Sequence, residues 1–241
     1  MASQNQVESR EDTERQDRTL IRIRSDSRVF FCGKTGSGKT YAAHRICRPI
    51  KRLIVLDPKA TIPAEHWKLA PWDREARTLL RNGEPIRALI RAPIGPGAEE
   101  EWDRAYKAVL EAGNATIYVD EVYGVVETGR PSPYLTAIWT RGRELGIGAF
   151  ASSQRPAWVP IVMMSEAEHH FVFRLTVGDD RRRMAEFLGP KVMEVIRDTH
   201  GLFYARAEWN EPIYLPALPT EEVVSSIGRT GKEHVANAAP A

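Results

Sequence analysis

The segment Gly-Lys-Thr-Gly-Ser-Gly-Lys-Thr at residues 33–40 has the spacing of a phosphate-binding loop. Glycines let such a loop curl so that successive backbone N–H groups face phosphate oxygens, and the start of the following helix adds a positive dipole end. Lys39 is expected to reach the β- and γ-phosphates of ATP, and the Thr40 hydroxyl to bind Mg²⁺. The residues that we expect to contact the nucleotide are Gly33, Lys34, Thr35, Gly36, Ser37, Gly38, Lys39, Thr40 and Tyr41.

Two carboxylates follow a second apolar run, in the sequence Ala-Thr-Ile-Tyr-Val-Asp-Glu at residues 115–121. Parallel strands carry their ligands at the carboxyl end, where these acids would emerge. Asp120 is expected to hold Mg²⁺, and Glu121 to orient and polarise the attacking water. The pair therefore predicts hydrolysis of the nucleotide, and the alternative is a solvated acidic turn.

A third apolar run, Leu-Ile-Val-Leu at residues 53–56, ends on Asp57, Pro58 and Lys59. Because Asp-Pro commonly starts a turn, these residues taken alone predict a turn after a strand.

Short apolar runs alternate along the chain with longer segments of helical period, which predicts an α/β fold with a mostly parallel sheet covered by helices. The loop at 33–40 lies directly between an expected strand and an expected helix, as its motif requires. We expect strands at 28–32, 53–56, 86–90, 116–119, 147–152, 171–175 and 202–205, and helices at 39–47, 99–112, 132–145, 181–188 and 191–198.

The 241 residues, 42% of them hydrophobic, are enough for one substantial core. The first 18 residues contain a single valine among charged and polar side chains, so we expect a disordered or partner-binding arm at 1–20. An ATPase domain is expected at 21–218, followed by a C-terminal helix and flexible tail at 219–241.

The net charge of +2 does not itself indicate a nucleic-acid partner. With no run of 18 apolar residues and a polar N-terminus, we expect an intracellular protein without a membrane partner. Cys32 and Cys47 do not have metal-ligand spacing and are expected to be reduced, buried thiols.

Further short motifs occur in a fixed order after Glu121. Residues 140–160 combine an arginine-ending helix, a glycine turn and a strand that closes on Gln154, Arg155 and Pro156. Residues 171–183 read Phe-Val-Phe-Arg-Leu-Thr-Val-Gly-Asp-Asp-Arg-Arg-Arg. Together with the Asp-Pro-Lys turn, these motifs resemble the FtsK and HerA superfamily of P-loop DNA translocases and virus genome-packaging ATPases, over about residues 28–206.

The resemblance implies a RecA-like three-layer sandwich of the P-loop NTPase class. It implies that Gln154 lies beside Glu121 and senses the γ-phosphate. It also implies that Arg143, or in its place Arg141, is a finger that reaches the nucleotide of a neighbouring subunit. The expected partners are double-stranded DNA and further copies of the chain, in a ring of five or six.

The chain has room for the motor domain but not for the β-barrel, winged-helix or nuclease domains that larger family members carry. That economy resembles the small packaging ATPases of viruses and phages, so we expect a genome-packaging motor. Such a motor would work in the host cytoplasm or at the packaging vertex, with a portal or capsid vertex protein as a further partner.

Two other classes of function remain as alternatives. Nucleotide kinases also join a P-loop to an arginine-rich lid, which residues 181–183 could imitate, although Glu121 and Gln154 suit water activation better than transfer to a metabolite. The chain could also be an assembly or switch protein that binds ATP without hydrolysing it. The intact Lys39, Thr40 and Asp120 argue against that alternative.

Overall fold

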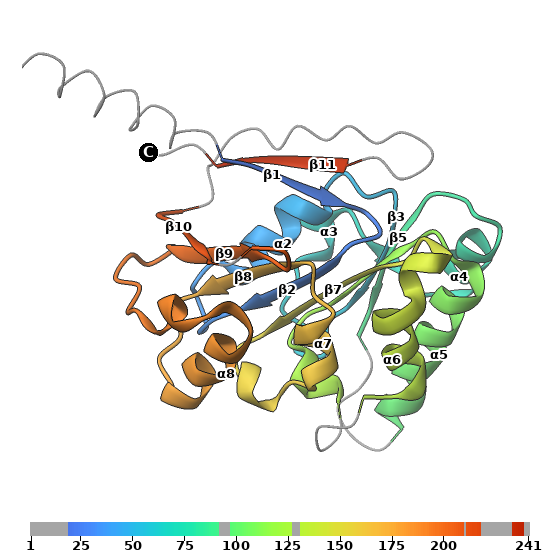
Figure 1. Cartoon of the computed structure of the whole chain (residues 1–241). Helices are drawn as coiled ribbons and strands as arrows, with labels where there is room; N and C mark the ends of the chain where they lie inside the picture. The colour runs from blue at the N-terminus through green and yellow to red at the C-terminus, as the bar shows by residue number, and fades with distance from the viewer. Residues whose placement is uncertain (1–18, 92–96, 127–130, 210, 218–232, 239–241) are drawn as a thin grey trace, which may run out of the picture.

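A computed structural model describes residues 19–91, 97–126, 131–209, 211–217 and 233–238. Its centre is a nine-stranded sheet with the strand order β10-β9-β8-β2-β7-β6-β3-β5-β4 (Figure 1). These strands are β2 (Arg28–Cys32), β3 (Arg52–Leu56), β4 (Ala70–Pro71), β5 (Ile86–Ile90), β6 (Thr116–Val119), β7 (Gly148–Ser153), β8 (His169–Phe173), β9 (Leu202–Arg206) and β10 (Ile213–Leu215).

The seven strands from β8 to β4 run parallel, and β9 and β10 are added antiparallel at one edge. The register pairs Cys32 with Ser153 and Val119 with Ala151, so β2 and β7 end together and β6 ends two residues earlier. The loops that leave these three strands therefore meet at the carboxyl edge of the sheet.

Helices cover both faces, which confirms the predicted three-layer arrangement (Figure 1). On one face lie α2 (Lys39–Cys47) and α3 (Ala64–Trp67). The other face carries α4 (Arg74–Arg81), α5 (Ala98–Ala112), α6 (Pro133–Arg141), α7 (Ile161–Ser165) and α8 (Gly178–Leu188). Short 3₁₀ turns join them: η1 (Val122–Val125), η2 (Gly142–Leu145), η3 (Pro156–Trp158) and η4 (Pro190–Met193).

Each face of the sheet has its own apolar cluster, because strand side chains alternate between the two sides. Beneath α2 and α3, the Phe31 ring stacks on Phe171 and meets Tyr118 edge to face. Phe30 and Ile117 belong to the cluster beneath the five helices of the other face. Among the described helices, none is long and apolar enough to cross a lipid bilayer.

The seven predicted strands are all present, each shifted by two residues or fewer at either end. The helix expected at 191–198 is wrong, because only the 3₁₀ turn η4 forms there. Val192 and Ile196 have helical spacing and are buried, but Met193 and Val195 between them are exposed, and Glu194 is extended. Two buried side chains do not make a continuous apolar face on which a helix could pack.

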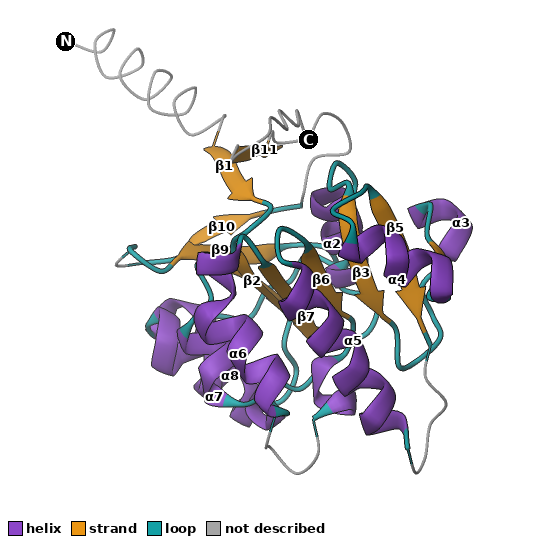
Figure 2. Cartoon of the chain, turned by 90° about the vertical axis from the view of Figure 1, so that its right-hand side faces the viewer, coloured by secondary structure: helices purple, strands orange, loops and turns teal. Residues whose placement is uncertain are grey.

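A two-stranded antiparallel ribbon lies apart from the main sheet, above α2 in the view of Figure 1 and above β10 in that of Figure 2. It pairs β1 (Thr19–Arg24) with β11 (Glu233–Ala238), and Ile21 and Ile23 are buried against the α2 side of the core. Of the segment 219–241, where a helix and a flexible tail are expected, the structure describes residues 233–238, and these form β11. The expectation for the rest of the segment stays a prediction.

Two neighbouring histidines on β8 should make the stability of the fold dependent on pH. His169 and His170 are buried, and their ring nitrogens hydrogen-bond Tyr204 Oη at 2.8 Å and the Met164 carbonyl at 3.0 Å. Burial lowers the pKa of His169 to about 3 and that of His170 to about 4. A histidine in the unfolded chain has a pKa near 6.5, so below that pH it binds a proton while the buried histidine of the folded chain stays neutral.

The free energy of unfolding should therefore be at its full value above pH 6.5 and fall below it, by roughly 2 kcal/mol per histidine at pH 5. Thermal unfolding between pH 7.5 and 5 measures this slope. A His169→Gln, His170→Gln double variant should show a flatter slope, and His200→Gln, at an exposed position, should not. An unchanged slope in the double variant would contradict the assignment.

Candidate nucleotide-hydrolysis site

The loop at 33–38 is held between two strand ends. The N–H of Gly33 donates to the Ser153 carbonyl at 3.2 Å, and the N–H of Lys34 donates to the Arg174 carbonyl at 2.9 Å. Gly33, with a φ of 151°, lies so close to Phe173 that an added Cβ would be 2.6 Å from the Phe173 Cβ. Only glycine fits there, so β7 and β8 directly shape the loop.

Lys39 closes this loop from the inside. Its side chain is buried, and Nζ donates to the carbonyls of Gly33 at 2.7 Å and Lys34 at 3.0 Å. Burial lowers the pKa of Lys39, and the charges of Glu121 and Asp120 oppose that effect. The ammonium group is thus already placed inside the loop, where phosphate oxygens could replace the two carbonyls.

Asp120 lies at the end of β6, where two hydroxyl groups hold its carboxylate in place. Tyr118 Oη and Ser152 Oγ each donate to Asp120 Oδ1 at 2.7 Å. Burial raises the pKa of Asp120, and these two hydrogen bonds hold it down. Both donors use the same carboxylate oxygen and leave Oδ2 for a cation, so the Asp120 carboxylate suits Mg²⁺, which prefers oxygen ligands.

Glu121 is buried and held by three donors. Its Oε1 accepts from the Gln154 N–H at 2.7 Å and from Ser153 Oγ at 3.3 Å, and its Oε2 pairs with Lys59 Nζ at 2.9 Å. The backbone of Glu121 is left-handed, with φ 56° and ψ 61°, a conformation that is costly for a residue with a side chain. The fold therefore fixes both the backbone and the carboxylate at this position.

Gln154 lies between the phosphate loop and Glu121. Its side-chain Oε1 accepts from Thr35 Oγ1 at 2.8 Å, while its backbone N–H binds Glu121. A movement of the phosphate loop at Thr35 would therefore be transmitted to Glu121 through Gln154 alone. The resemblance implies that Gln154 senses the γ-phosphate, and this role stays a prediction.

Lys59 is a site residue whose contact the sequence reasoning missed. Asp57 is buried and accepts from the N–H groups of Thr61 and Ile62 at 3.1 and 2.9 Å and from Arg91 Nε at 3.2 Å. Those bonds shape the expected turn so that Lys59, two residues on, reaches Glu121. The local sequence gave no signal for this contact, because it depends on β3 pairing with β6, which brings the carboxyl end of β3 beside Glu121.

Arg143 lies at the amino-end edge of the sheet, opposite the carboxyl ends that carry the site, on η2 just before β7. Its side chain is 57% exposed and its NH1 is 3.9 Å from Glu168 Oε1. Arg141, the other candidate finger, is also exposed. Six residues of strand span about 20 Å, so Arg143 is too far from the nucleotide loop of its own chain to act there.

Arginines near the site are mostly tied to acids. Arg155 donates to the buried Asp180 at 2.9 Å and lies 4.1 Å from the ring centroid of Trp158. On α8, Arg182 pairs with Asp179, and Arg183 pairs with Glu186 at 2.7 Å. The arginine helix is thus a face of local ion pairs. The stretch 123–130, with Gly124, Gly129 and Arg130, is on its sequence a candidate pore loop, and residues 127–130 of it lie outside the described residues.

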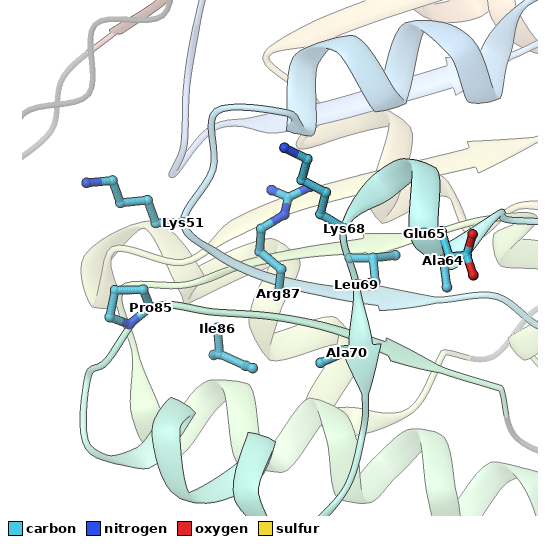
Figure 3. Close-up of a pocket in the computed structure, with 9 residues that line it drawn as sticks. All are labelled: Lys51, Ala64, Glu65, Lys68, Leu69, Ala70, Pro85, Ile86 and Arg87. Atoms are coloured by element: carbon cyan, nitrogen blue, oxygen red, sulfur yellow. The ribbon is translucent and has the colours of Figure 1, made fainter.

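A surface hollow lies away from the residues of this site, where β4 meets β5 (Figure 3). Lys51, Lys68 and Arg87 give it a basic rim. The Arg87 guanidinium is already used, since it donates to the Ile50 carbonyl at 2.5 Å and the Trp67 carbonyl at 2.9 Å. Arg87 therefore fastens the end of α2 to α3, and none of the predicted site residues lines this hollow.

No family model matches the chain. The DNA packaging ATPase P9 of Enterobacteria phage PRD1 is 28% identical over 230 residues, which cover 88% of this chain and 97% of P9. The two chains are homologous. The genome packaging NTPase B204 of Sulfolobus turreted icosahedral virus 2, in complex with AMP, matches the structure with a TM-score of 0.64 at 14% identity, over 80% of this chain and 98% of B204.

Further solved structures share the fold. B204 is also known in complex with AMPPCP and with ATP-γS. VirB4 of Thermoanaerobacter pseudethanolicus matches with a TM-score of 0.53 at 8% identity, over 79% of this chain and 89% of VirB4. EssC (ATPases 2 and 3) of Geobacillus thermodenitrificans gives 0.51 at 12% identity, over 82% of this chain and 41% of EssC. The predicted P-loop NTPase fold and the resemblance to packaging and FtsK/HerA-like ATPases are confirmed.

The hydrogen bond from Tyr118 should tune the cation site. Tyr118→Phe keeps the ring, which stacks on Trp67, but removes the donor to Asp120. We expect the pKa of Asp120 to rise, since the lost hydrogen bond stabilises the charged carboxylate. The acid limb of the pH–ATPase profile should shift upward equally, and the Mg²⁺ concentration for half-maximal rate should rise about tenfold.

Tyr106→Phe is the matched control, because Tyr106 is also fully buried but lies on α5, away from the site. Identical Mg²⁺ titrations and pH profiles for Tyr118→Phe and the wild type would show that Asp120 does not bind the cation.

Proposed function

We propose that the chain is an ATP-driven double-stranded DNA translocase, and that it packages the genome of a virus or phage. The observation that carries the proposal is the buried group of Lys39, Asp120 and Glu121, which lies at one sheet edge around a phosphate-binding loop. Homology to a DNA packaging ATPase supports ATP hydrolysis and gives it a setting.

In the proposed reaction, Lys39 leaves the loop carbonyls and binds the β- and γ-phosphates. Thr40 and Asp120 would hold Mg²⁺, and the bound ion would supply positive charge to neutralise the phosphates. Glu121 orients a water molecule whose oxygen attacks the γ-phosphorus, and it accepts the proton as the bond to the β–γ bridging oxygen breaks. Gln154 responds to the γ-phosphate through its side-chain hydrogen bond with Thr35, and its backbone N–H transmits this response to Glu121.

The cation that completes this site comes from another copy of the chain. Lys59 is paired with Glu121 and Arg155 with Asp180, so neither is available to the phosphate chain while those contacts last. Arg143 is exposed at the far edge of the sheet and can serve a neighbouring subunit. A closed ring of five or six copies around DNA, attached to a portal or capsid vertex protein in the host cytoplasm, would repeat this contact at every interface.

Steady-state ATPase activity with and without linear double-stranded DNA tests the proposal. We expect DNA to raise turnover at least severalfold. Glu121→Gln should abolish turnover in both conditions and still bind ATP, because only the proton acceptor is lost. Turnover that ignores DNA but requires an added nucleoside would favour a kinase, and ATP binding without turnover under any condition would favour a switch protein.

Mixing two inactive variants tests the action of Arg143 on a neighbour. Arg143→Ala alone should lose at least 100-fold in turnover, since arginine fingers contribute about 10³ to 10⁵ in rate. Arg143→Ala subunits retain Glu121, and Glu121→Gln subunits retain Arg143, so a mixture should regain activity if the arginine works between chains. The same mixture made with Arg141→Ala separates the two candidates. A mixture that remains as inactive as its components would reject Arg143.

A further inference from the structure

Beside the catalytic edge, on the α7–α8 side, the surface has a hollow of about 550 Å³. Tyr123 and Val126 line it from the segment that follows Glu121, and the segment 157–161 lines it from the residues that follow Gln154. Arg183 of α8 completes the wall. The hollow is therefore built from the two segments that carry the predicted catalytic groups.

The walls of this hollow are apolar and aromatic. Trp158 is 55% and Ile161 59% exposed, which is unusual for side chains of this size and marks an interaction surface when they occur together. The Tyr123 and Trp158 rings meet edge to face, with centroids 5.7 Å apart. This rigid aromatic corner can receive one apolar side chain.

The charges that the structure describes around the hollow already have partners. Arg183 pairs with Glu186, Arg155 with Asp180, and Lys59 with Glu121. Each of these three cations is matched by an acid, so the described walls offer no surplus positive charge with which to attract the phosphates of DNA. Its chemistry suits a protein side chain better than a nucleic-acid backbone.

The same chain presents a matching apolar side chain at the opposite sheet edge. Leu145, at the end of η2, is 45% exposed and lies two residues from Arg143. The turn that carries it is fastened by three backbone hydrogen bonds: Asn114 N–H to the Leu145 carbonyl at 2.8 Å, Gly146 N–H to Arg143 at 3.0 Å, and Ile147 N–H to Gly142 at 2.8 Å. Leu145 is thus an exposed side chain on a fixed support.

We propose that Leu145 of one copy docks into the hollow formed by Tyr123, Trp158 and Ile161 of the next copy, and so directs Arg143 toward that copy's nucleotide. The inference rests on the proposed function, in which Arg143 acts between subunits. The spacings agree, because Leu145 is two residues from Arg143 and Tyr123 is two residues from Glu121, and two residues span at most about 7 Å.

This contact is head-to-tail, since it joins two different surfaces of the same chain and leaves both available on the outer copies. It also touches the catalytic group. Lys59 Nζ lies 5.6 Å from the centroid of the Tyr123 ring and pairs with Glu121 at 2.9 Å. A side chain that enters the hollow therefore contacts the Tyr123 ring, which lies against Lys59, the ion-pair partner of Glu121. Docking of the neighbouring copy would in this way affect the catalytic carboxylate.

Cysteine crosslinking tests the docking directly. Cys32 and Cys47 are fully buried and should not react. We expect a Leu145→Cys, Ile161→Cys double variant, treated with a short bismaleimide in the presence of ATP-γS, to form a ladder of dimers, trimers and larger species on a denaturing gel. Either single variant should stay monomeric, and a mixture of the two single variants should stop at dimers. A Lys107→Cys, Ile161→Cys pair, with the first cysteine on the exposed side of α5, is the matched control and should form no ladder.

Crosslinks in a single variant, or an equal ladder in the control, would overturn the proposal. A missing ladder alongside restored activity in the Arg143→Ala and Glu121→Gln mixture would also overturn it, while leaving the action of Arg143 between subunits intact. A ladder without stimulation by DNA would support the docking and count against the translocase function instead.

A second variant guards against a failure of the cysteine variants to fold. Leu145→Asp should lower turnover at least tenfold at subunit concentrations that support the wild type, and higher concentrations should restore part of it. Leu145→Met keeps an apolar side chain of similar size and should behave as the wild type. Equal turnover for Leu145→Asp and Leu145→Met at low concentration would overturn the proposal.

Discussion

The structure depends on keeping the Lys39 ammonium and the carboxylates of Asp120 and Glu121 buried at one edge of a parallel sheet, with the more exposed Lys59 paired to Glu121. Lys39 and Lys59 face Asp120 and Glu121 there, and charges withdrawn from water are tolerated only when they are paired and hydrogen-bonded. The residues that follow the carboxyl ends of β2, β3 and β6 supply all four, which is possible because these strands end within two residues of one another. The order of the strands is thus a requirement of the charge balance.

Neutral donors complete that balance. Tyr118 and Ser152 hold Asp120, and Ser153 and the Gln154 N–H hold Glu121, so the two acids share no donor side chain. Three of those donors come from the end of β7. The strand that lies between β2 and β6 therefore acts as the common support for the phosphate loop and both acids. A shift of β7 by one residue would exchange the roles of its serines and leave both acids unsupported.

The parts of the fold and site that could be predicted are those written in local sequence. The phosphate loop, Asp120 and Glu121 each follow an apolar strand run, and their residue types alone imply their chemistry. The contact of Lys59 with Glu121 could not be read locally, because it depends on β3 pairing with β6.

Pairing partners distant in sequence explain the remaining differences. β11 has no apolar run of its own and becomes a strand only against β1. The segment 191–198 has a helical spacing of two apolar side chains but no surface on which the intervening residues could pack. The exposed Leu145 gave no signal at all, since a leucine near the end of a predicted helix is ordinarily buried.

The ribbon of β1 and β11 also bears on how the chain folds. It pairs Arg24 with Glu233, so it closes a loop of more than 200 residues. Closing so long a loop in an unfolded chain costs about 5 kcal/mol of entropy, far more than a two-stranded ribbon of this length returns. Once the central sheet has formed, both strands already lie above α2 and most of that cost has been met. The ribbon should therefore assemble last, and it should be the first part to open under mechanical or thermal load.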